Sequence, residues 1–133
     1  MYLLDTNVCV VVIRRQPPAL IQRLTSHAPD GVAVSTITVA ELQFGVAKSQ
    51  APAKNQAALD HFLVPLDILP FDHAACEAYG RVRADLERRG LAIGSLDTLI
   101  AAHALSLGAV VVTNNVREFS RVSGLVVEDW TAV

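Results

Sequence analysis

The sequence predicts an α/β fold with a central, mainly parallel sheet flanked by helices, formed as a single domain by residues 1–133. Short apolar runs at residues 2–4, 32–35 and 109–112 show no polar alternation, which is typical of strands buried on both faces of a parallel sheet. Longer segments with apolar residues at helical spacing separate these runs. This alternation is the pattern of α/β proteins, and the length of the chain is that of one domain.

The spacing of apolar residues and the breaks in the chain give the order of the elements. We expect strands at residues 2–4, 32–35, 66–69, 109–112 and 126–127. We expect helices at residues 7–15, 19–27, 36–48, 56–63, 73–89 and 95–107, with a loop at 49–55. The boundaries have local causes, because Pro17 and Pro18 can start a helix and Gly90 and Gly108 can end one.

Polar residues at the strand-to-helix junctions are expected to cap the helices that follow. Thr6 or Asn7 can cap the helix after the first strand, and Thr36 or Thr38 can cap the helix after the second. In parallel sheets, ligands bind outside the carboxyl ends of the strands. A binding site is therefore expected at these junctions, near Asp5.

Composition narrows the class of protein further. Hydrophobic residues make up 52% of the chain and charged residues 18%, which predicts a large core or an additional apolar contact surface. The net charge of −2 argues against a broad basic surface for nonspecific nucleic-acid binding. Cys9 and Cys76 have neither disulfide nor zinc spacing, and no apolar stretch is long enough to span a bilayer. We expect a cytoplasmic protein with no membrane contact.

Three acids, Asp5, Glu41 and Asp97, are candidates for function because each lies at a predicted element boundary or on a helix next to one. Each also has an ordinary alternative role. Asp5 could cap a helix, Glu41 could be solvated or could form a capping box with Thr38, and Asp97 could complement a helix dipole. Their combination indicates function, because three separate segments can bring the acids together at one edge of the sheet.

Converging carboxylates require a cation, since like charges held within several Å raise one another's pKa. Oxygen ligands without paired cysteines or histidines favour Mg²⁺, with Mn²⁺ as a substitute. The chemistry that this predicts is metal-assisted attack of water on a phosphodiester.

Four motifs and the C-terminal segment resemble a known family. They are LDTN at residues 4–7, TVAELQFG at 38–45, IGSLDTLIAAHA at 93–104, VTNNVREF at 112–119 and LVVEDW at 125–130. In this order and spacing they resemble the PIN-domain ribonuclease toxins of the VapC type, and they cover almost the whole chain.

The resemblance implies a PIN fold and a Mg²⁺-dependent endoribonuclease, the toxin of a type II toxin–antitoxin system that cuts a structured RNA such as tRNA. It also implies a cognate VapB-type antitoxin that blocks the site, DNA binding only through that antitoxin, and a homodimer within a higher hetero-oligomer. By matching positions, Asp5, Glu41 and Asp97 are the catalytic and metal-binding acids.

One position departs from the family pattern. Many PIN nucleases have a fourth acid just after the threonine of the last motif, where this chain has Asn115. An amide adds no negative charge, so one tightly held metal is expected, and Glu118 is a possible substitute for the missing acid. Thr6, Asn7 and Thr113 are expected to support the site by orienting carboxylates or water.

Other chemistries fit the sequence less well. His103 is expected to be a core residue rather than a general base, and Ser35 and Ser95 have no histidine partner in reach by sequence, which argues against a nucleophilic triad. A phosphatase with Asp5 as the nucleophile would need a second acid at Asn7. The main alternative is a catalytically weak PIN-like module that acts through its antitoxin partner and DNA.

Overall fold

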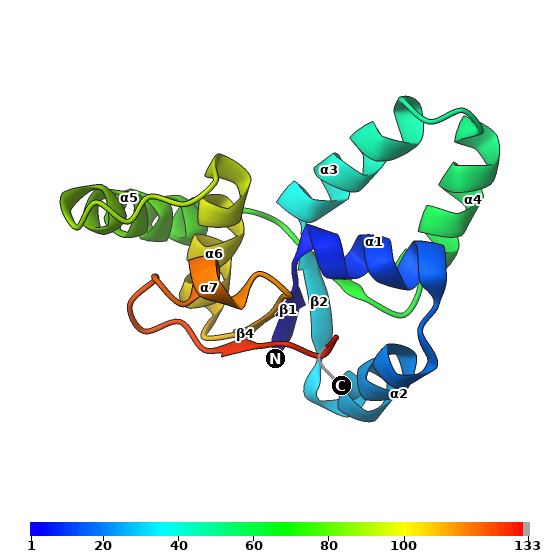
Figure 1. Cartoon of the computed structure of the whole chain (residues 1–133), viewed down its shortest axis with the longest axis horizontal. Coiled ribbons are helices and arrows are strands. Elements are labelled where there is room, and N and C mark those ends of the chain that lie inside the picture. The colour runs from blue at the N-terminus through cyan, green and yellow to red at the C-terminus, as the bar shows by residue number, and fades with distance from the viewer. Residues whose placement is uncertain (132–133) are drawn as a thin grey trace.

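Five short strands form one parallel sheet in this computed structural model, which describes residues 1–131 (Figure 1). The strands are β1 (Tyr2–Leu4), β2 (Val32–Ser35), β3 (Asp67–Leu69), β4 (Val110–Val112) and β5 (Val127–Glu128). Their order across the sheet is β3-β2-β1-β4-β5, and every neighbouring pair is parallel. The predicted α/β class is confirmed, and the sheet is entirely rather than mainly parallel.

Helices cover both faces of this sheet. They are α1 (Thr6–Arg15), α2 (Pro18–His27), α3 (Thr36–Ala47), α4 (Pro52–Leu63), α5 (His73–Arg88), α6 (Ser95–Leu107) and α7 (Val116–Phe119), with a 3-10 turn, η1 (Ala28–Asp30), after α2. Helices α1 to α4 pack on one face, and α5 to α7 pack on the other. None of the helices within residues 1–131 is long and apolar enough to cross a membrane.

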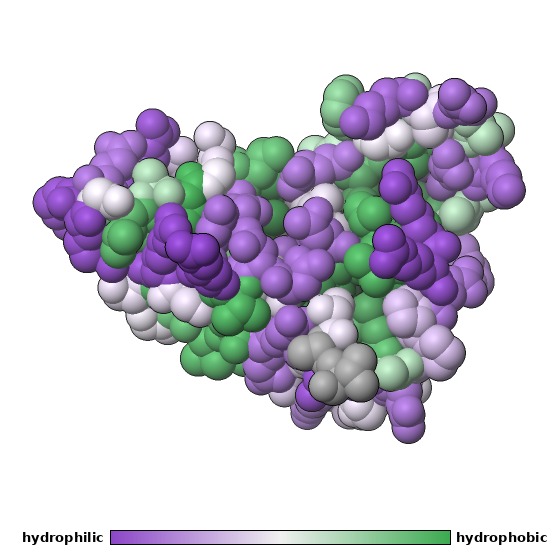
Figure 2. All heavy atoms as spheres, viewed as in Figure 1, coloured by the Kyte–Doolittle hydropathy of each residue, from purple (hydrophilic) through white to green (hydrophobic). Residues whose placement is uncertain are grey.

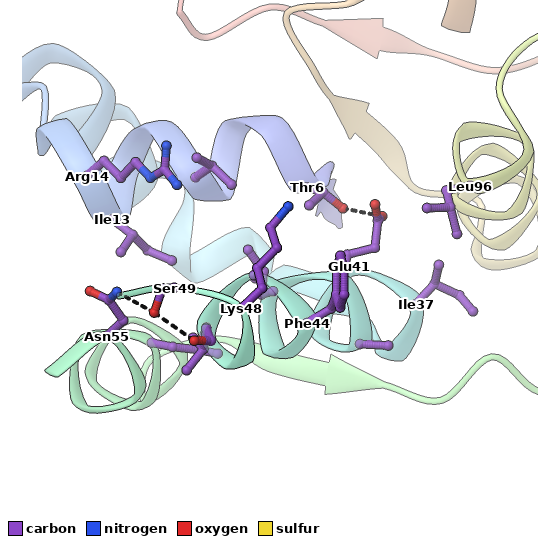
Figure 3. Close-up of a pocket in the computed structure, with 16 residues that line it drawn as sticks. Thr6, Ile13, Arg14, Ile37, Glu41, Phe44, Lys48, Ser49, Asn55 and Leu96 are labelled. Atoms are coloured by element: carbon purple, nitrogen blue, oxygen red, sulfur yellow. Dashed lines mark hydrogen bonds between the residues drawn. The ribbon is translucent and has the colours of Figure 1, made fainter. Parts of the chain in front are cut away.

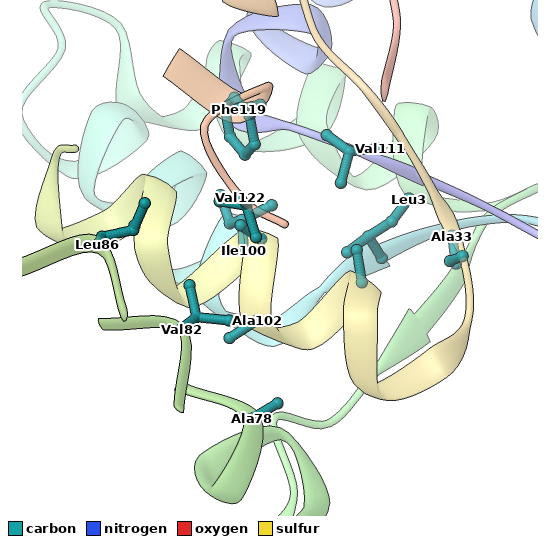
Figure 4. Close-up of a cluster of buried hydrophobic side chains, with 13 residues drawn as sticks. Leu3, Ala33, Ala78, Val82, Leu86, Ile100, Ala102, Val111, Phe119 and Val122 are labelled. Atoms are coloured by element: carbon teal, nitrogen blue, oxygen red, sulfur yellow. The ribbon is translucent and has the colours of Figure 1, made fainter. Parts of the chain in front are cut away.

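The two hydrophobic clusters lie on opposite faces of the sheet because successive strand residues point in opposite directions. Leu3 packs with Ala33, Val82 and Ile100 beneath α5 and α6 (Figure 4). Leu4 belongs to the other cluster, beneath α1 to α4. Both leucines are completely buried, which explains why the first strand reads as an uninterrupted apolar run.

The caps of the two helices next to the site differ from those predicted. Asp5, rather than Thr6 or Asn7, caps α1, since its carboxylate accepts a hydrogen bond from the Val8 amide. Ser35, rather than Thr36 or Thr38, caps α3. At both junctions the chain passes from strand to helix without a loop, so the residue directly before the first helical residue provides the cap.

Other boundaries shift by a few residues. Helix α4 begins at Pro52, so the loop predicted at residues 49–55 is shorter, which is consistent with the preference of proline for the first turn of a helix. The final strand is Val127–Glu128 rather than residues 126–127. Helix α6 ends as predicted at Gly108, whose φ of 64° is a left-handed conformation that favours glycine.

The order of the strands determines where a site can form. From β1, the chain adds β2 and β3 on one side and β4 and β5 on the other, so the switch point lies between β1 and β4. Asp5 directly follows β1, and Thr113 directly follows β4. Ligands of open α/β sheets bind in the crevice at such a point.

We expect Leu3→Ala to lower the free energy of unfolding by about 2–5 kcal/mol, because it removes buried methyl groups from the central strand and leaves a cavity. Urea unfolding followed by circular dichroism measures this change. Val126→Ala is the control, because Val126 is largely exposed and its loss should change stability by less than about 0.5 kcal/mol. Equal effects of the two substitutions would contradict the assigned core.

Candidate active site

Asp5 is buried at the carboxyl end of β1, where both of its oxygens accept hydrogen bonds. The Val8 amide donates to Oδ1 at 2.9 Å, and the Thr113 hydroxyl donates to Oδ2 at 2.5 Å. Burial raises the pKa of Asp5, and the nearby Glu41 charge raises it further, while the bonds from Thr113 and Val8 oppose the rise. The side chain is thus held in one orientation, with the remaining lone pairs of its oxygens available to a ligand.

Glu41 lies in the middle of α3, and a hydroxyl from α1 holds its carboxylate. Thr6 Oγ1 donates to Glu41 Oε1 at 2.7 Å and lies 3.3 Å from the buried hydroxyl of Thr38. Glu41 is therefore not the capping-box partner of Thr38. The bond links α3 to α1 directly beside Asp5.

Asp97 lies in the first turn of α6 among other acids. Burial, followed by the charges of Asp5, Glu118 and Glu41, raises its pKa to about 6. The side-chain amide of Asn115 opposes it, with Nδ2 lying 3.5 Å from Asp97 Oδ2 and 3.2 Å from Glu118 Oε2. Four carboxylates thus influence one site, and Asn115 provides an N–H donor within it.

Residues from β1–α1, α3 and α6 line a cavity of about 360 Å³ at this position. The lining residues are Asp5, Thr6, Asn7, Glu41, Gly94, Ser95, Leu96 and Asp97. None of them is a lysine or arginine. In the view of Figure 2, hydrophilic residues gather at the centre of the face, over the start of α1, with hydrophobic residues on either side.

These donors fit a hard divalent cation. No three side chains of histidine, cysteine, aspartate or glutamate within residues 1–131 lie close enough to enclose an ion by themselves. Mg²⁺ does not need such an enclosure, because it keeps several waters and binds through one or two carboxylates together with substrate phosphate. Burial is the main cause of the raised pKa of Asp97, and the charges of Asp5, Glu118 and Glu41 add to it; a cation would neutralise those charges.

The structure brings together most of the residues chosen from the sequence. Asp5, Glu41, Asp97, Thr6 and Asn7 line the cavity, while Thr113, Asn115 and Glu118 contact or influence its acids. The exposed Asn7 also donates through its backbone amide to Asp5. Ser95 and Thr38 were not predicted as part of the site. Their closeness in sequence to the predicted acids could have indicated them, since Ser95 lies two residues before Asp97 and Thr38 three residues before Glu41.

The expectation that Ser35 lacks a histidine partner is wrong. His103 Nδ1 lies 2.8 Å from Ser35 Oγ, although the two residues are 68 positions apart in the chain. Both are buried, with 0% of Ser35 and 1% of His103 exposed, so Ser35 cannot reach a substrate as a nucleophile. The prediction of a core histidine at position 103 is confirmed.

An apolar groove of about 660 Å³ adjoins the acid cavity and shares Thr6, Glu41 and Leu96 with it (Figure 3). It runs between α1 and α3 toward Asn55 on α4, and Arg14 lies at the end away from the acids. Phe44 is 65% exposed in this groove, with the Lys48 ammonium 5.0 Å from its ring centroid.

Known proteins match nearly the whole chain. It is 44% identical over 131 residues to ribonuclease VapC2 of Rickettsia felis and 41% identical over 130 residues to the tRNA(fMet)-specific endonuclease VapC of Shigella flexneri, covering 98% of each chain in both cases. Among solved structures, VapBC2 from Rickettsia felis bound to a promoter DNA fragment superposes with a TM-score of 0.94 at 42% identity, covering 97% of this chain and 98% of that one. DNA-bound VapBC from Salmonella typhimurium also gives 0.94, at 41% identity and 97% coverage of both chains.

The fold and the acid cluster identify this chain as a PIN-domain protein, and the family model of the PIN domain matches residues 2–125. Similarity over the full length then narrows the class. The chain belongs to the VapC-type ribonuclease toxins of VapBC toxin–antitoxin systems, which confirms the resemblance seen in the motifs.

We expect the metal-free protein to lose stability relative to Asp97→Asn as the pH rises. The pKa of Asp97 is about 6 in the folded protein, whereas an unperturbed aspartate has a value of 3.8. The proton on Asp97 therefore stabilises the fold fully below about pH 4, and that stabilisation is lost as the pH passes about 6. Urea unfolding in EDTA between about pH 4 and about pH 7.5 measures the difference. Asp60→Asn, an exposed acid on α4, is the control, and a pH-independent gap between wild type and Asp97→Asn would contradict the assignment.

Proposed function

We propose that this ribonuclease is a Mg²⁺-dependent endonuclease whose catalytic acids are Asp5, Glu41 and Asp97. One observation carries the proposal: carboxylates from three separate segments line the same cavity, and burial together with its acidic neighbours raises the pKa of Asp97 to about 6. An acid cluster of this kind at the switch point of a parallel sheet is suited to a divalent cation and a phosphate group.

The side chains have separable roles in this proposal. Asp5 and Asp97 bind the cation, and Glu41 is a third acid oriented by Thr6. When bound, Mg²⁺ or Mn²⁺ activates water and neutralises the charge that develops on the phosphate. Thr113 keeps one oxygen of Asp5 in place, and Asn115 donates toward Asp97 and Glu118. Glu118 supplies negative charge near the position where Asn115 replaces an acid.

A structured RNA such as tRNA is the proposed substrate. The relatives from Shigella flexneri and Salmonella typhimurium are named tRNA(fMet)-specific endonucleases and are each 41% identical to this chain. Aromatic residues make up only 5% of the sequence, so few aromatic side chains are available to stack on RNA bases. Recognition is therefore assigned to the shape and backbone of a folded RNA.

The apolar groove is the proposed docking site of a VapB-type antitoxin. Its walls from α1, α3 and α4 present an apolar surface suited to the hydrophobic face of a helix or extended segment. Because the groove shares Thr6 and Glu41 with the acid cavity, a partner bound there also restricts access to the acids. Solved VapBC relatives are bound to DNA together with their antitoxins, so we assign DNA binding to the antitoxin, within a cytoplasmic hetero-oligomer built on a toxin homodimer.

A second candidate is a catalytically weak protein-binding module. The size of the apolar groove and the amide at Asn115 favour it, because both serve binding without adding charge to the active site. Both candidates require the antitoxin, so only RNA cleavage distinguishes them.

We expect Asp5→Asn and Asp97→Asn each to lower cleavage of initiator tRNA by at least about 100-fold in Mg²⁺, because each removes a charge that binds the cation. Glu41→Gln should lower it by at least about 10-fold. Single-turnover cleavage with gel analysis of the products measures these rates, and EDTA should abolish the wild-type reaction.

Asp60→Asn is the matched control, since it removes an exposed acid far along α4 and should cleave at the wild-type rate. Equal cleavage by the wild type and the three active-site variants would reject the proposed acids. Absence of cleavage by the wild type across tRNA species would favour the binding module.

We expect Phe44→Ala to weaken binding of the cognate antitoxin by about 30-fold, the loss typical of an aromatic residue that anchors an interface. Titration calorimetry with the purified antitoxin measures the affinity. Val64→Ala is the control, because Val64 is 80% exposed and does not line the groove. Unchanged affinity for Phe44→Ala would place the antitoxin elsewhere.

A further inference from the structure

The buried pair Ser35 and His103 joins the two helices that carry Glu41 and Asp97. Ser35 is the cap residue of α3, and His103 lies in the middle of α6. Ser35 Oγ and His103 Nδ1 are 2.8 Å apart with both residues essentially inaccessible to water. This is a direct polar link between α3 and α6 inside the core.

The hydrogen bonds around this pair are directional. The Ile37 amide donates to Ser35 Oγ, so the single serine proton is free to point at His103 Nδ1. The imidazole also hydrogen-bonds the Pro70 backbone, which fits a ring proton on the nitrogen that does not face Ser35. No buried side-chain nitrogen or oxygen atom within residues 1–131 is left without a partner. Burial favours the neutral imidazole, and its hydrogen bonds hold the ring in place.

An apolar side chain would fill this position at a lower cost. The neighbouring residues of α6 are apolar, among them Ile100, Ala102 and Ala104, and burial of the imidazole lowers its pKa. Burying a polar ring is unfavourable unless its hydrogen bonds are satisfied. The histidine therefore contributes a directional hydrogen bond rather than the gain from burying an apolar side chain. A polar residue here fixes how α6 meets the start of α3.

The spacing relates this link to the acids. On α3, Glu41 lies six residues after the cap residue Ser35, and on α6, His103 lies six residues after Asp97, which is about 9 Å along the helix in each case. At one end of this interval the helices are joined by the serine–histidine bond, and at the other end Glu41 and Asp97 line the same cavity. A rotation or shift of either helix at the bond would change the separation of the two carboxylates.

We propose that Ser35 and His103 are positioning residues, whose hydrogen bond sets the separation of Glu41 and Asp97 and so the affinity of the acid cavity for a divalent cation. The inference rests on the proposed function, because it requires that these acids bind the cation. Neither residue can contact substrate, since both are buried in the core and neither lines the cavity.

A double-mutant cycle with Mn²⁺ affinity as the readout tests this pair. Titration calorimetry on the RNA-free protein should show about tenfold weaker Mn²⁺ binding for both Ser35→Ala and His103→Leu. The double variant should bind no more weakly than the weaker single variant, because both substitutions remove the same bond. His103→Asn should recover part of the affinity, since its side-chain oxygen can accept the serine proton.

Val82→Ala is the matched control for lost core packing, because Val82 on α5 belongs to the same hydrophobic cluster as α6 but takes no part in the bond between Ser35 and His103. It should lower the melting temperature without changing Mn²⁺ affinity. Wild-type affinity in Ser35→Ala and His103→Leu, or independent losses that multiply in the double variant, would overturn the positioning role alone. Absence of Mn²⁺ binding by the wild-type protein would instead overturn the proposed function and this inference with it.

Discussion

The buried hydrogen bond from Thr113 to Asp5 joins the carboxyl ends of β4 and β1 at the point where the order of the strands reverses. The other oxygen of Asp5 caps α1, so a single carboxylate fixes the middle strand, the next strand and the first helix relative to one another. Thr6, the first residue of that helix, then holds Glu41. Folding of the sheet and assembly of the site therefore depend on the same side chain.

The site is built at a cost to the fold. Burial raises the pKa of Asp97, and the nearby charges of Asp5, Glu118 and Glu41 raise it further, because each charge is unfavourable to the others. Donors from Thr113, Thr6 and the Asn115 amide offset part of this repulsion. The remaining charge is what makes the cavity suited to a cation, and strain of this kind at functional sites is common where activity and stability compete.

The sequence predicted this site more completely than it predicted the local contacts within it. Asp5, Glu41 and Asp97 could be chosen because each lies beside a strand end or a helix start, and those positions meet at one edge of a parallel sheet. The caps at Asp5 and Ser35 were assigned one to three residues too late, since several polar residues compete at each junction and only the backbone path decides among them. The bond between Ser35 and His103 has no local pattern at all, because 68 residues separate its partners.

The sequence by itself determined the α/β class, the approximate order of the elements and the family. Apolar periodicity, helix stops and motifs are local properties that survive without a folded core. Only the tertiary structure decided that every strand is parallel and that the groove and the acid cavity share Thr6, Glu41 and Leu96. It also decided that burial and neighbouring acids raise the pKa of Asp97 to about 6. These features depend on distances and burial between residues far apart in the chain, which packing sets and no local pattern encodes.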